Sequence, residues 1–382
     1  MHLCSFCYDI YKDKTEAVED PACCELCEGL SNDLEFLSKL MVEESKDFEF
    51  KSFYLGTKLY DEIAEREEKL NVKGLFKHFF NLELRSRFEE LSKKEHISNK
   101  GDIYFLVDAR LNYVKVTPSP LYLCGRYNKL SRELSQTTKT CLKCNGHGCI
   151  YCNGKGKLYD NSVEEIISGP LIKETLAKGS KFHGMGREDV DVRMLGNGRP
   201  FVIELIEPKK RKIDLKKAEK EINKSDSVKV KDLEYSCEKR VEEIKSAKLD
   251  KTYGATVSIQ EHIQKEQIES ALEELSGSNV YQRTPQRVLH RRSDIVRIRR
   301  VKSAELLDFN PGSVKISFKT ESGTYIKELV NGDKGRTVPS LVSLLNCECK
   351  VDHLDVISIE EGKNDQNVTW KEERDAKVAY EK

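Results

Sequence analysis

The chain has 382 residues, of which 34% are charged and 38% hydrophobic, and its formal net charge is zero. It contains no apolar run near the roughly 20 residues that a membrane-spanning helix needs, and no secretory leader pattern follows Met1. These features exclude a membrane protein and predict a cytoplasmic one, and the length predicts two domains or a large domain with an appendage.

The zero net charge hides an asymmetry along the chain. Residues 1–120 contain 17 Lys/Arg and 24 Asp/Glu, whereas residues 121–382 contain 48 and 41. Phosphate neutralisation by Lys and Arg supplies most non-specific nucleic-acid affinity, so the C-terminal part is the expected face for a polyanion. The alternative is a charged surface that contacts only solvent.

Two Cys-x-x-Cys pairs lie near the start of the chain. Without a secretory signal the thiols are expected to stay reduced, and thiolates at this spacing are typical of a structural zinc site. Cys23 is an alternative to Cys24, but it would place three residues rather than two between the members of its pair. The alternative to zinc is a set of free thiols in a small core. The predicted ligands are Cys4, Cys7, Cys24 and Cys27.

The next hundred residues predict a small α/β domain. Residues 33–94 have a mainly helical pattern of apolar positions. Residues 102–108 and 113–116 are apolar, strand-like runs joined by a short polar segment, which predicts a hairpin. Pro118 and Pro120 then interrupt the chain, so we place a domain boundary between residues 120 and 121.

The segment after this boundary mixes cations with an aromatic residue. Arg126, Tyr127, Lys129 and Arg132 lie within seven residues, as an RNA-contacting surface would require. Arg126 and Lys129 are therefore candidate RNA contacts. The alternative is a strand that joins two domains and has ordinary charged neighbours.

A second set of four cysteines follows, with a glycine shortly after each pair where the backbone must turn. His147 lies between the pairs, but four thiolates already complete a tetrahedral site, so a surface or RNA-contacting role is expected for it. Four sulfur ligands leave no open position for water, and the site is expected to be structural. The sequence pattern of this segment also resembles one module of the DnaJ-type chaperone zinc domain, but only over about sixteen residues. The predicted ligands are Cys141, Cys144, Cys149 and Cys152.

Acidic and basic residues alternate between Gly186 and Phe201, directly before the apolar run of residues 201–206. The apolar run predicts a strand and the glycine-rich segment a loop. A carboxylate flanked by arginines on such a loop is held ionised, and it can be a nucleophile, a base or a partner in a salt bridge. The alternating residues are Arg187, Glu188, Asp189, Asp191 and Arg193.

The most basic stretch of the chain spans residues 283–302. Its first half contains Thr284-Pro285 and no periodicity, which predicts a loop. Its second half alternates Ile or Val with Arg, which predicts a strand with one cationic edge.

Three motifs in this order resemble the Pus-ten family of tRNA pseudouridine synthases. They are the Gly-Arg-x-Asp segment ending at Asp189, the Lys-x-Tyr-x-Ala segment around Tyr253, and residues 322–340. The resemblance implies an α/β (α+β) fold whose catalytic domain, residues 121–382, has a mixed, largely antiparallel sheet and includes the second cysteine set. It also implies that residues 1–120 form a zinc-bearing, THUMP-containing RNA-binding domain.

The resemblance also implies residue roles. Asp189 would be the nucleophile, and Arg187 would help displace the target base from its stack. Tyr253 would hold the base and move protons, while Lys327 would pair with Asp189 beside its apolar companion Ile326. In the "thumb" loop of the family, the expected phosphate contacts are Arg287, His290, Arg291 and Arg292.

The expected function is isomerisation of uridine to pseudouridine in the T loop of tRNA, at position 54, 55 or both. The resemblance implies that no organic cofactor is needed, and the cysteine pairs predict one or two structural zinc ions. The expected substrate is the T arm of tRNA, and we expect a monomeric enzyme without membrane attachment. The alternatives are a non-catalytic tRNA-binding zinc protein and a zinc-dependent chaperone-like module.

Overall fold

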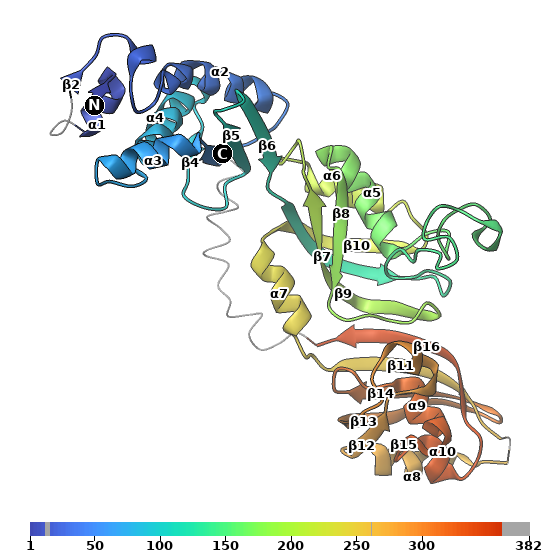
Figure 1. The fold of residues 1–382 in the computed structure, drawn as a ribbon. Helices are drawn as coiled ribbons and strands as arrows, with labels where there is room; N and C mark the ends of the chain where they lie inside the picture. The colour runs from blue at the N-terminus through green and yellow to red at the C-terminus, as the bar shows by residue number, and fades with distance from the viewer. Residues whose placement is uncertain (12–15, 261, 361–382) are drawn as a thin grey trace. The chain divides into compact units, whose positions relative to one another are not determined.

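The computed structural model describes residues 1–11, 16–260 and 262–360 (Figure 1). The chain divides into two units. Unit 1 comprises residues 1–121, 171–180 and 205–213, and unit 2 comprises residues 122–170, 181–204 and the chain from residue 214 onward. The expected C-terminal boundary at residue 382 lies outside the described residues. Within them, we find no helix with the length and apolar character required to cross a membrane.

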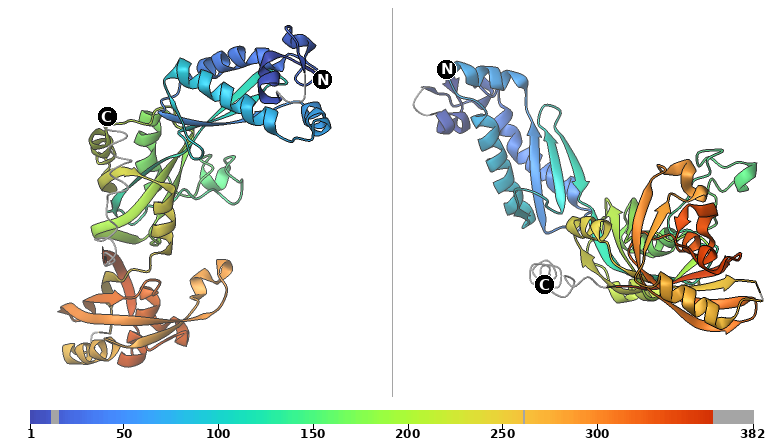
Figure 2. Two further views of the ribbon diagram at one scale, coloured as in Figure 1. Left: turned by 90° about the vertical axis from the view of Figure 1, so that its left-hand side faces the viewer. Right: turned by 90° about the horizontal axis from the view of Figure 1, so that it is seen from below.

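Unit 1 contains a four-stranded sheet in the order β4-β3-β5-β6, against which α2 and α4 pack (Figures 1 and 2). Rings of Phe88 on α4 and Phe53 on β3 lie 4.7 Å apart, and Phe105 on β5 lies 4.9 Å from Phe88. These buried aromatics form the centre of its core. The elements are β1 (His2–Leu3), α1 (Ser5–Tyr11), β2 (Glu16–Ala17), the 3-10 turns η2 (Pro21–Cys23) and η3 (Leu30–Asn32), α2 (Asp33–Ser45), β3 (Ser52–Lys58), α3 (Asp61–Lys69), α4 (Leu75–Ser92), β4 (Glu95–His96), β5 (Ile103–Asp108) and β6 (Tyr113–Pro118).

The predicted hairpin of unit 1 is confirmed, but the prediction of helix through residues 33–94 is wrong at one segment. β5 and β6 pair antiparallel, as expected. Residues Ser52–Lys58 form the strand β3, which pairs parallel with β5. This segment is rich in aromatic and β-branched side chains, and pairing with a distant strand decides its conformation.

Unit 2 is built on a mixed sheet with the path β10-β7-β9-β16-β11-β14-β13-β12-β15, and β8 pairs with β9. β9 and β16 pair parallel, whereas β11 pairs antiparallel with both β14 and β16. The fold is therefore the mixed α/β class that was predicted. Residues 121, 171–180 and 205–213 are assigned to unit 1, so β7, α5, β8 and β9 each belong partly to that unit. The elements from residue 121 onward are β7 (Leu121–Lys129), the 3-10 turn η4 (Ile150–Cys152), α5 (Val163–Thr175), β8 (Gly179–Gly184), β9 (Val192–Ile206), α6 (Leu215–Ile222), β10 (Val228–Ser236), α7 (Glu238–Ser246), β11 (Lys251–Ser258), α8 (Lys265–Leu275), β12 (Asn279–Arg283), the 3-10 turn η5 (Gln286–Arg291), β13 (Val296–Asn310), β14 (Ser313–Thr320), α9 (Ile326–Asn331), the 3-10 turn η6 (Gly332–Gly335), β15 (Thr337–Val338), α10 (Leu341–Leu345) and β16 (Lys350–Ile359).

Strand β9 is longer than the sequence pattern predicts, because it begins at Val192 rather than at Phe201. The prediction of a loop is thus wrong for residues 192–200. Gly198 has a φ of +75°, and a Cβ atom there would lie 2.9 Å from the carbonyl oxygen of Tyr127 on β7. The glycine lets two strands approach closely, so the segment joins the sheet. The loop before β9 is correspondingly short and ends at Asp191.

Candidate active site

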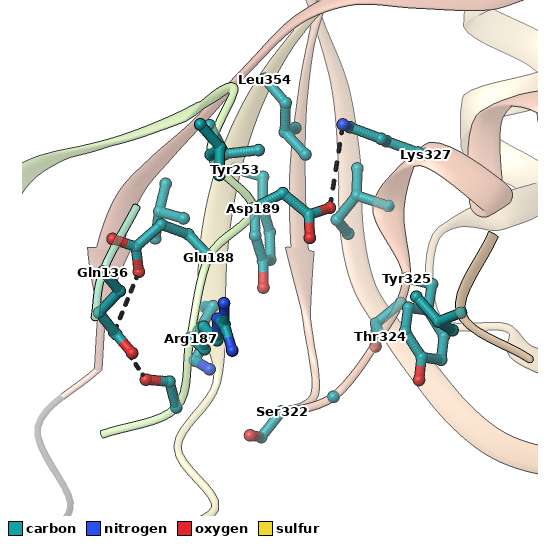
Figure 3. Close-up of a pocket in the computed structure, with 18 of the residues that line it drawn as sticks. Gln136, Arg187, Glu188, Asp189, Tyr253, Ser322, Thr324, Tyr325, Lys327 and Leu354 are labelled. Atoms are coloured by element: carbon teal, nitrogen blue, oxygen red, sulfur yellow. Dashed lines mark hydrogen bonds and ion pairs between the residues drawn. The ribbon is translucent and has the colours of Figure 1, made fainter. Parts of the chain in front are cut away.

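A cavity of about 430 Å³ lies within unit 2, beside the loop that precedes β9 (Figure 3). The loop contributes Asp189, β11 contributes Tyr253, and the start of α9 contributes Ile326 and Lys327. The three motifs therefore meet in one cavity although they are far apart in the sequence. The other lining residues that matter below are Gln136, Lys139, Arg187, Glu188, Arg199, Lys251, Arg287, Arg291, Arg292, Tyr325, Leu354 and Val356.

Asp189 lies between two cations. Arg287 Nη1 donates to Asp189 Oδ2 at 2.8 Å. Lys327 Nζ lies 3.9 Å from the same oxygen (Figure 3). Lys327 is closer to Asp191, whose Oδ2 accepts its hydrogen bond at 2.6 Å. Burial acts to raise the pKa of Asp191, but the hydrogen bond and charge of Lys327 outweigh it and lower that pKa. The nearest cation to Asp189 is thus Arg287, and Lys327 is shared between two carboxylates.

Arg287 is itself held in place by a buried carboxylate. Its Nε donates to Glu328 Oε1 at 2.7 Å, and the side chain of Glu328 is only 4% exposed. Glu328 belongs to α9, so this helix positions Arg287 as well as Lys327. Sequence reasoning placed Arg287 among the phosphate contacts and did not identify Glu328. The chain of contacts from Glu328 through Arg287 to Asp189 gives the carboxylate a fixed orientation.

One part of the cavity wall is apolar or aromatic. Tyr253 is 9% exposed, and burial raises the pKa of its hydroxyl to about 12. Ile326 is 3% exposed, and Leu354 and Val356 from β16 also line the cavity. Figure 3 shows the ring of Tyr253 beside the carboxylate of Asp189. A flat base can stack against such a ring while the carboxylate reaches its sugar or its edge.

A buried cluster of polar side chains packs against the Asp189 loop. Arg199 Nε and Glu188 Oε2 lie 2.9 Å apart, and both side chains are 1% exposed. The hydroxyl of Tyr127 donates to Glu188, and Gln136 Nε2 donates to the carbonyl oxygen of Gly186 at 3.0 Å. Sequence reasoning did not identify this cluster as part of the site. The sequence contains one indication of this cluster, because the charged residue Arg199 lies next to the apolar half of β9.

Two residues expected to contact RNA donate hydrogen bonds to backbone carbonyl oxygens. Lys129 is 0% exposed, and its Nζ donates to the carbonyl oxygens of Leu134, Asp189 and Val190. Burial lowers the pKa of Lys129 to about 8. A fully buried ammonium cannot reach RNA in this arrangement, so the prediction that Lys129 contacts RNA is wrong. Lys129 instead holds the Asp189 loop in place. Arg126 donates to the carbonyl oxygens of Asn197 and Gly198.

The other predicted contacts are exposed around the cavity. Arg187, Arg291 and Arg292 line it, and all three are exposed. Arg292 Nη1 donates to the hydroxyl of Tyr325 at 2.8 Å. His290 is exposed but does not line the cavity. The predicted loop of this region contains the 3-10 turn η5, and the predicted strand is confirmed as β13.

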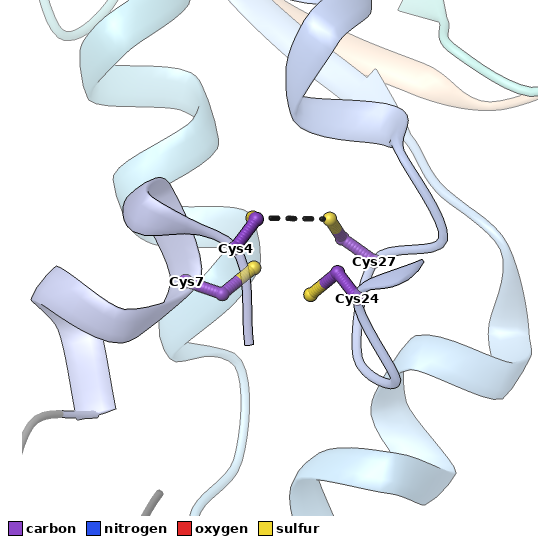
Figure 4. Close-up of side chains that lie close together, drawn as sticks. All are labelled: Cys4, Cys7, Cys24 and Cys27. Carbon is purple, nitrogen blue, oxygen red and sulfur yellow. Dashed lines mark hydrogen bonds between the residues drawn. The ribbon is translucent and has the colours of Figure 1, made fainter. Parts of the chain in front are cut away.

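The first set of cysteines converges in unit 1 (Figure 4). The sulfur atoms of Cys4 and Cys27 lie 3.7 Å apart, and the four sulfurs lie within 4.8 Å of one another. A tetrahedral ion with metal–sulfur bonds of about 2.3 Å needs sulfurs roughly 3.8 Å apart, so the set fits such an ion. The set contains Cys24, whereas Cys23 is exposed, which settles the alternative.

The second set converges in unit 2 with the same geometry. Its sulfur–sulfur distances include 3.9 Å for Cys141–Cys149, 3.8 Å for Cys144–Cys152 and 3.7 Å for Cys149–Cys152. Gly156 N donates to Cys152 Sγ at 3.2 Å, and a Cβ atom on Gly156 would lie 2.2 Å from a carbonyl oxygen. A glycine is needed there for the backbone to wrap around the sulfurs. Both sets can hold a metal ion.

Comparisons with known proteins agree with the motifs. The family described as "Pus10, C-terminal" matches residues 122–360. The tRNA pseudouridine synthase Pus10 of Archaeoglobus fulgidus is 41% identical over 362 residues, covering 94% of this chain and 100% of that protein. The protein of the same name from Pyrococcus furiosus is 35% identical over 350 residues, covering 89% and 85%.

A solved structure described as "Crystal Structure of a Cbf5-Nop10-Gar1 Complex" contains a chain with a TM-score of 0.37 and 15% identity, covering 66% of this chain and 56% of that chain. The family assignment rests on the sequence matches, which span most of the chain. This family is the one called Pus-ten above. The chain therefore belongs to the Pus10 family of tRNA pseudouridine synthases, which are isomerases.

Proposed function

We propose that this enzyme converts uridine to pseudouridine in the T loop of tRNA, at position 54, 55 or both, with Asp189 as the nucleophile. The observation that carries the proposal is the position of Asp189, which lines the cavity beside Tyr253 and is paired with Arg287. A carboxylate held between cations next to an aromatic wall suits attack on a flipped nucleoside. A cytoplasmic location and a monomeric state stay predictions from the sequence.

The reaction needs a bond to break and a different one to form between the same base and sugar. Asp189 attacks the flipped uridine at the anomeric carbon C1′ or at the ring, and the N1–C1′ bond breaks with its electron pair going to the base. The base turns, C5 bonds to C1′ as the bond to Asp189 breaks, and a proton moves from C5 to N1. Tyr253 holds the base during this turn, and Arg287 and Lys327 keep Asp189 oriented.

The cationic rim binds the tRNA backbone in this proposal. Arg187, Arg291 and Arg292 are exposed beside the cavity, where phosphates flanking a flipped nucleotide would pass. Arg187 also helps to separate the target base from its neighbours. Unit 1 acts as a THUMP-containing RNA-binding domain, as the resemblance implies.

Both cysteine sets hold structural zinc in this proposal. Four thiolates at tetrahedral spacing suit Zn²⁺, and they leave no coordination position open for water or substrate. Bound zinc would supply folding free energy and no step of the reaction. His147 is exposed and lies outside the ligand set, so four sulfurs complete the second site.

A T-arm transcript tests the proposal. The enzyme should introduce pseudouridine at position 54, at position 55 or at both, and nucleotide-resolution mapping of the product shows which. Tight binding of the transcript without any isomerised uridine would instead favour the non-catalytic tRNA-binding protein. Isomerisation confined to another arm of a full tRNA would overturn the T-loop assignment.

Removing two rim arginines should weaken tRNA binding in a salt-dependent way. In Arg291→Ala/Arg292→Ala, the slope of log affinity against log salt concentration should fall by about one to two, because two phosphate contacts are lost. The control is Lys265→Ala/Lys315→Ala, which removes the same charge from two lysines that pair with carboxylates outside the cavity. A slope equal in both double variants would place the arginines away from the RNA.

Loss of two ligands should empty the second zinc site. Cys141→Ser/Cys144→Ser should lower the zinc content by one ion per chain and loosen residues 135–160, because metal binding there is coupled to folding. Elemental analysis and hydrogen exchange measure the two effects. Cys237→Ser is the control, since this exposed cysteine belongs to neither set. Unchanged zinc in the double variant would contradict the assignment.

A further inference from the structure

Lys251 is a buried cation in the wall of the active-site cavity. It is the first residue of β11, and alternate residues of this strand are buried, so Lys251 lies on the same face of the sheet as Tyr253. Lys251 is 8% exposed and lines the cavity together with Asp189. It belongs to the Lys-x-Tyr segment, yet the roles assigned above give it no function.

The ammonium group of Lys251 has no hydrogen-bond or ion-pair partner among the residues that the structure describes. A Cβ atom placed on Gly186 would lie 3.2 Å from Lys251 Nζ and 3.3 Å from Arg199 Nη1, so two cations converge beside the Asp189 loop. The buried carboxylate nearby, Glu188, is paired with Arg199. Lys251 thus has no direct partner of opposite charge, and it shares the attraction of Glu188 with Arg199.

An uncompensated buried charge is unfavourable until an opposite charge reaches it. Burial lowers the pKa of Lys251 to about 8, which still leaves the group mainly protonated at neutral pH. The target base is neutral when it binds, so negative charge on the base itself arises only during the reaction. Preorganised cations directed at such developing charge are a major source of catalysis.

We propose that Lys251 is a catalytic residue that stabilises the negative charge developing on the uracil ring. This rests on the proposed function. When the N1–C1′ bond breaks, its electron pair passes to the base, and the resulting uracil anion spreads its charge over N1 and the carbonyl oxygens O2 and O4. If Asp189 adds to the ring instead, the same electron flow makes an enolate at a carbonyl oxygen. Lys251 Nζ donates a hydrogen bond to that oxygen on either route.

The test is Lys251→Met, which keeps the length of the side chain and removes its charge. Under single-turnover conditions with saturating enzyme, conversion of uridine in a T-arm transcript should slow by about 10²- to 10³-fold, as for loss of one oxyanion donor. The affinity for the transcript should not change. The variant should unfold at the same or a higher temperature than the parent, because it loses an unpaired buried charge.

A base that is a better leaving group than uracil distinguishes charge stabilisation by Lys251 from other roles of this residue. In a transcript with 5-fluorouridine at the target position, fluorine withdraws electrons and stabilises the uracil anion, so Lys251→Met should slow cleavage of the N1–C1′ bond less than it does with uridine. Lys319→Met is the matched control. Lys319 on β14 lies opposite Thr252, the neighbour of Lys251 on β11, and it does not line the cavity. Its rates should equal those of the parent.

Several results would overturn the inference. They are a parent-like rate in Lys251→Met, a loss of affinity without a loss of single-turnover rate, and an equal slowing with both bases. If Lys251→Met fails to fold, Lys251→Gln gives the same comparison while retaining an N–H donor. Failure of the parent enzyme to isomerise T-loop uridine would count against the proposed function. If the parent is active, the rate of Lys251→Met compared with that of the parent tests the role of Lys251 alone.

Discussion

Asp189→Asn should abolish pseudouridine formation while leaving tRNA affinity nearly unchanged. Asparagine keeps the size of the side chain but lacks the ionised oxygen that must attack, so we expect the rate to fall by about 10⁴-fold or more. Phosphate contacts supply most of the binding, and they lie on other residues. The measurement is pseudouridine formation in a tRNA transcript beside a binding titration. A near-parental rate would show that Asp189 is not the nucleophile.

Asp191→Asn is the control for this substitution. Asp191 is two residues further on, its side chain is 62% exposed, and it accepts a hydrogen bond from Lys327. Loss of its charge should weaken that pair and leave Lys327 free to interact with Asp189. We therefore expect Asp191→Asn to keep measurable activity. An equal loss in both variants would mean that the loop requires both carboxylates, and the nucleophile would then need to be identified by trapping the covalent adduct.

Arg199→Met should cause the second large effect, on stability as well as on activity. The substitution leaves Glu188 as a buried carboxylate without its cation, which typically costs about 3–5 kcal/mol. It also removes the hydrogen bond from Arg199 Nη1 to the carbonyl oxygen of Met185, at the start of the Asp189 loop. We expect a lower free energy of unfolding in denaturant titrations and a slower reaction under conditions where the variant remains folded.

The double variant Glu188→Gln/Arg199→Met tests whether the pair is the cause. Removing both charges leaves neither Glu188 nor Arg199 as a buried ion without its partner, so the double variant should be more stable than the sum of the two single effects predicts, by about 0.5–3 kcal/mol. Arg193→Met is the control, because Arg193 pairs with Asp355 and is 37% exposed. Additive effects of the two buried substitutions would indicate that Glu188 and Arg199 act independently.

Features that depend on neighbouring residues could be predicted from the sequence. The two sets of four cysteines could be predicted from the spacing of their Cys-x-x-Cys pairs. The β5–β6 hairpin could be predicted from two apolar runs with a short polar segment between them. The helix α5 begins at Val163, directly after Ser162, a residue type that commonly caps helices, and Ser162 Oγ accepts from Glu165 N at 3.1 Å. The motifs also assign Asp189 and Tyr253 to one site, and both residues line the same cavity.

Features that depend on distant segments were decided by the tertiary structure. Arg287 pairs with a carboxylate 98 positions away in the chain, and this required η5 and the Asp189 loop to meet at one cavity. Lys129 and Arg126 have the same cationic pattern as an RNA-contacting surface, but segments far away in the sequence lie against them. Lys129 donates to carbonyl oxygens of the Asp189 loop, and Arg126 donates to those of residues 197 and 198. A sequence pattern specifies which groups are charged, but the packing of distant segments determines which charges are buried and which groups they meet.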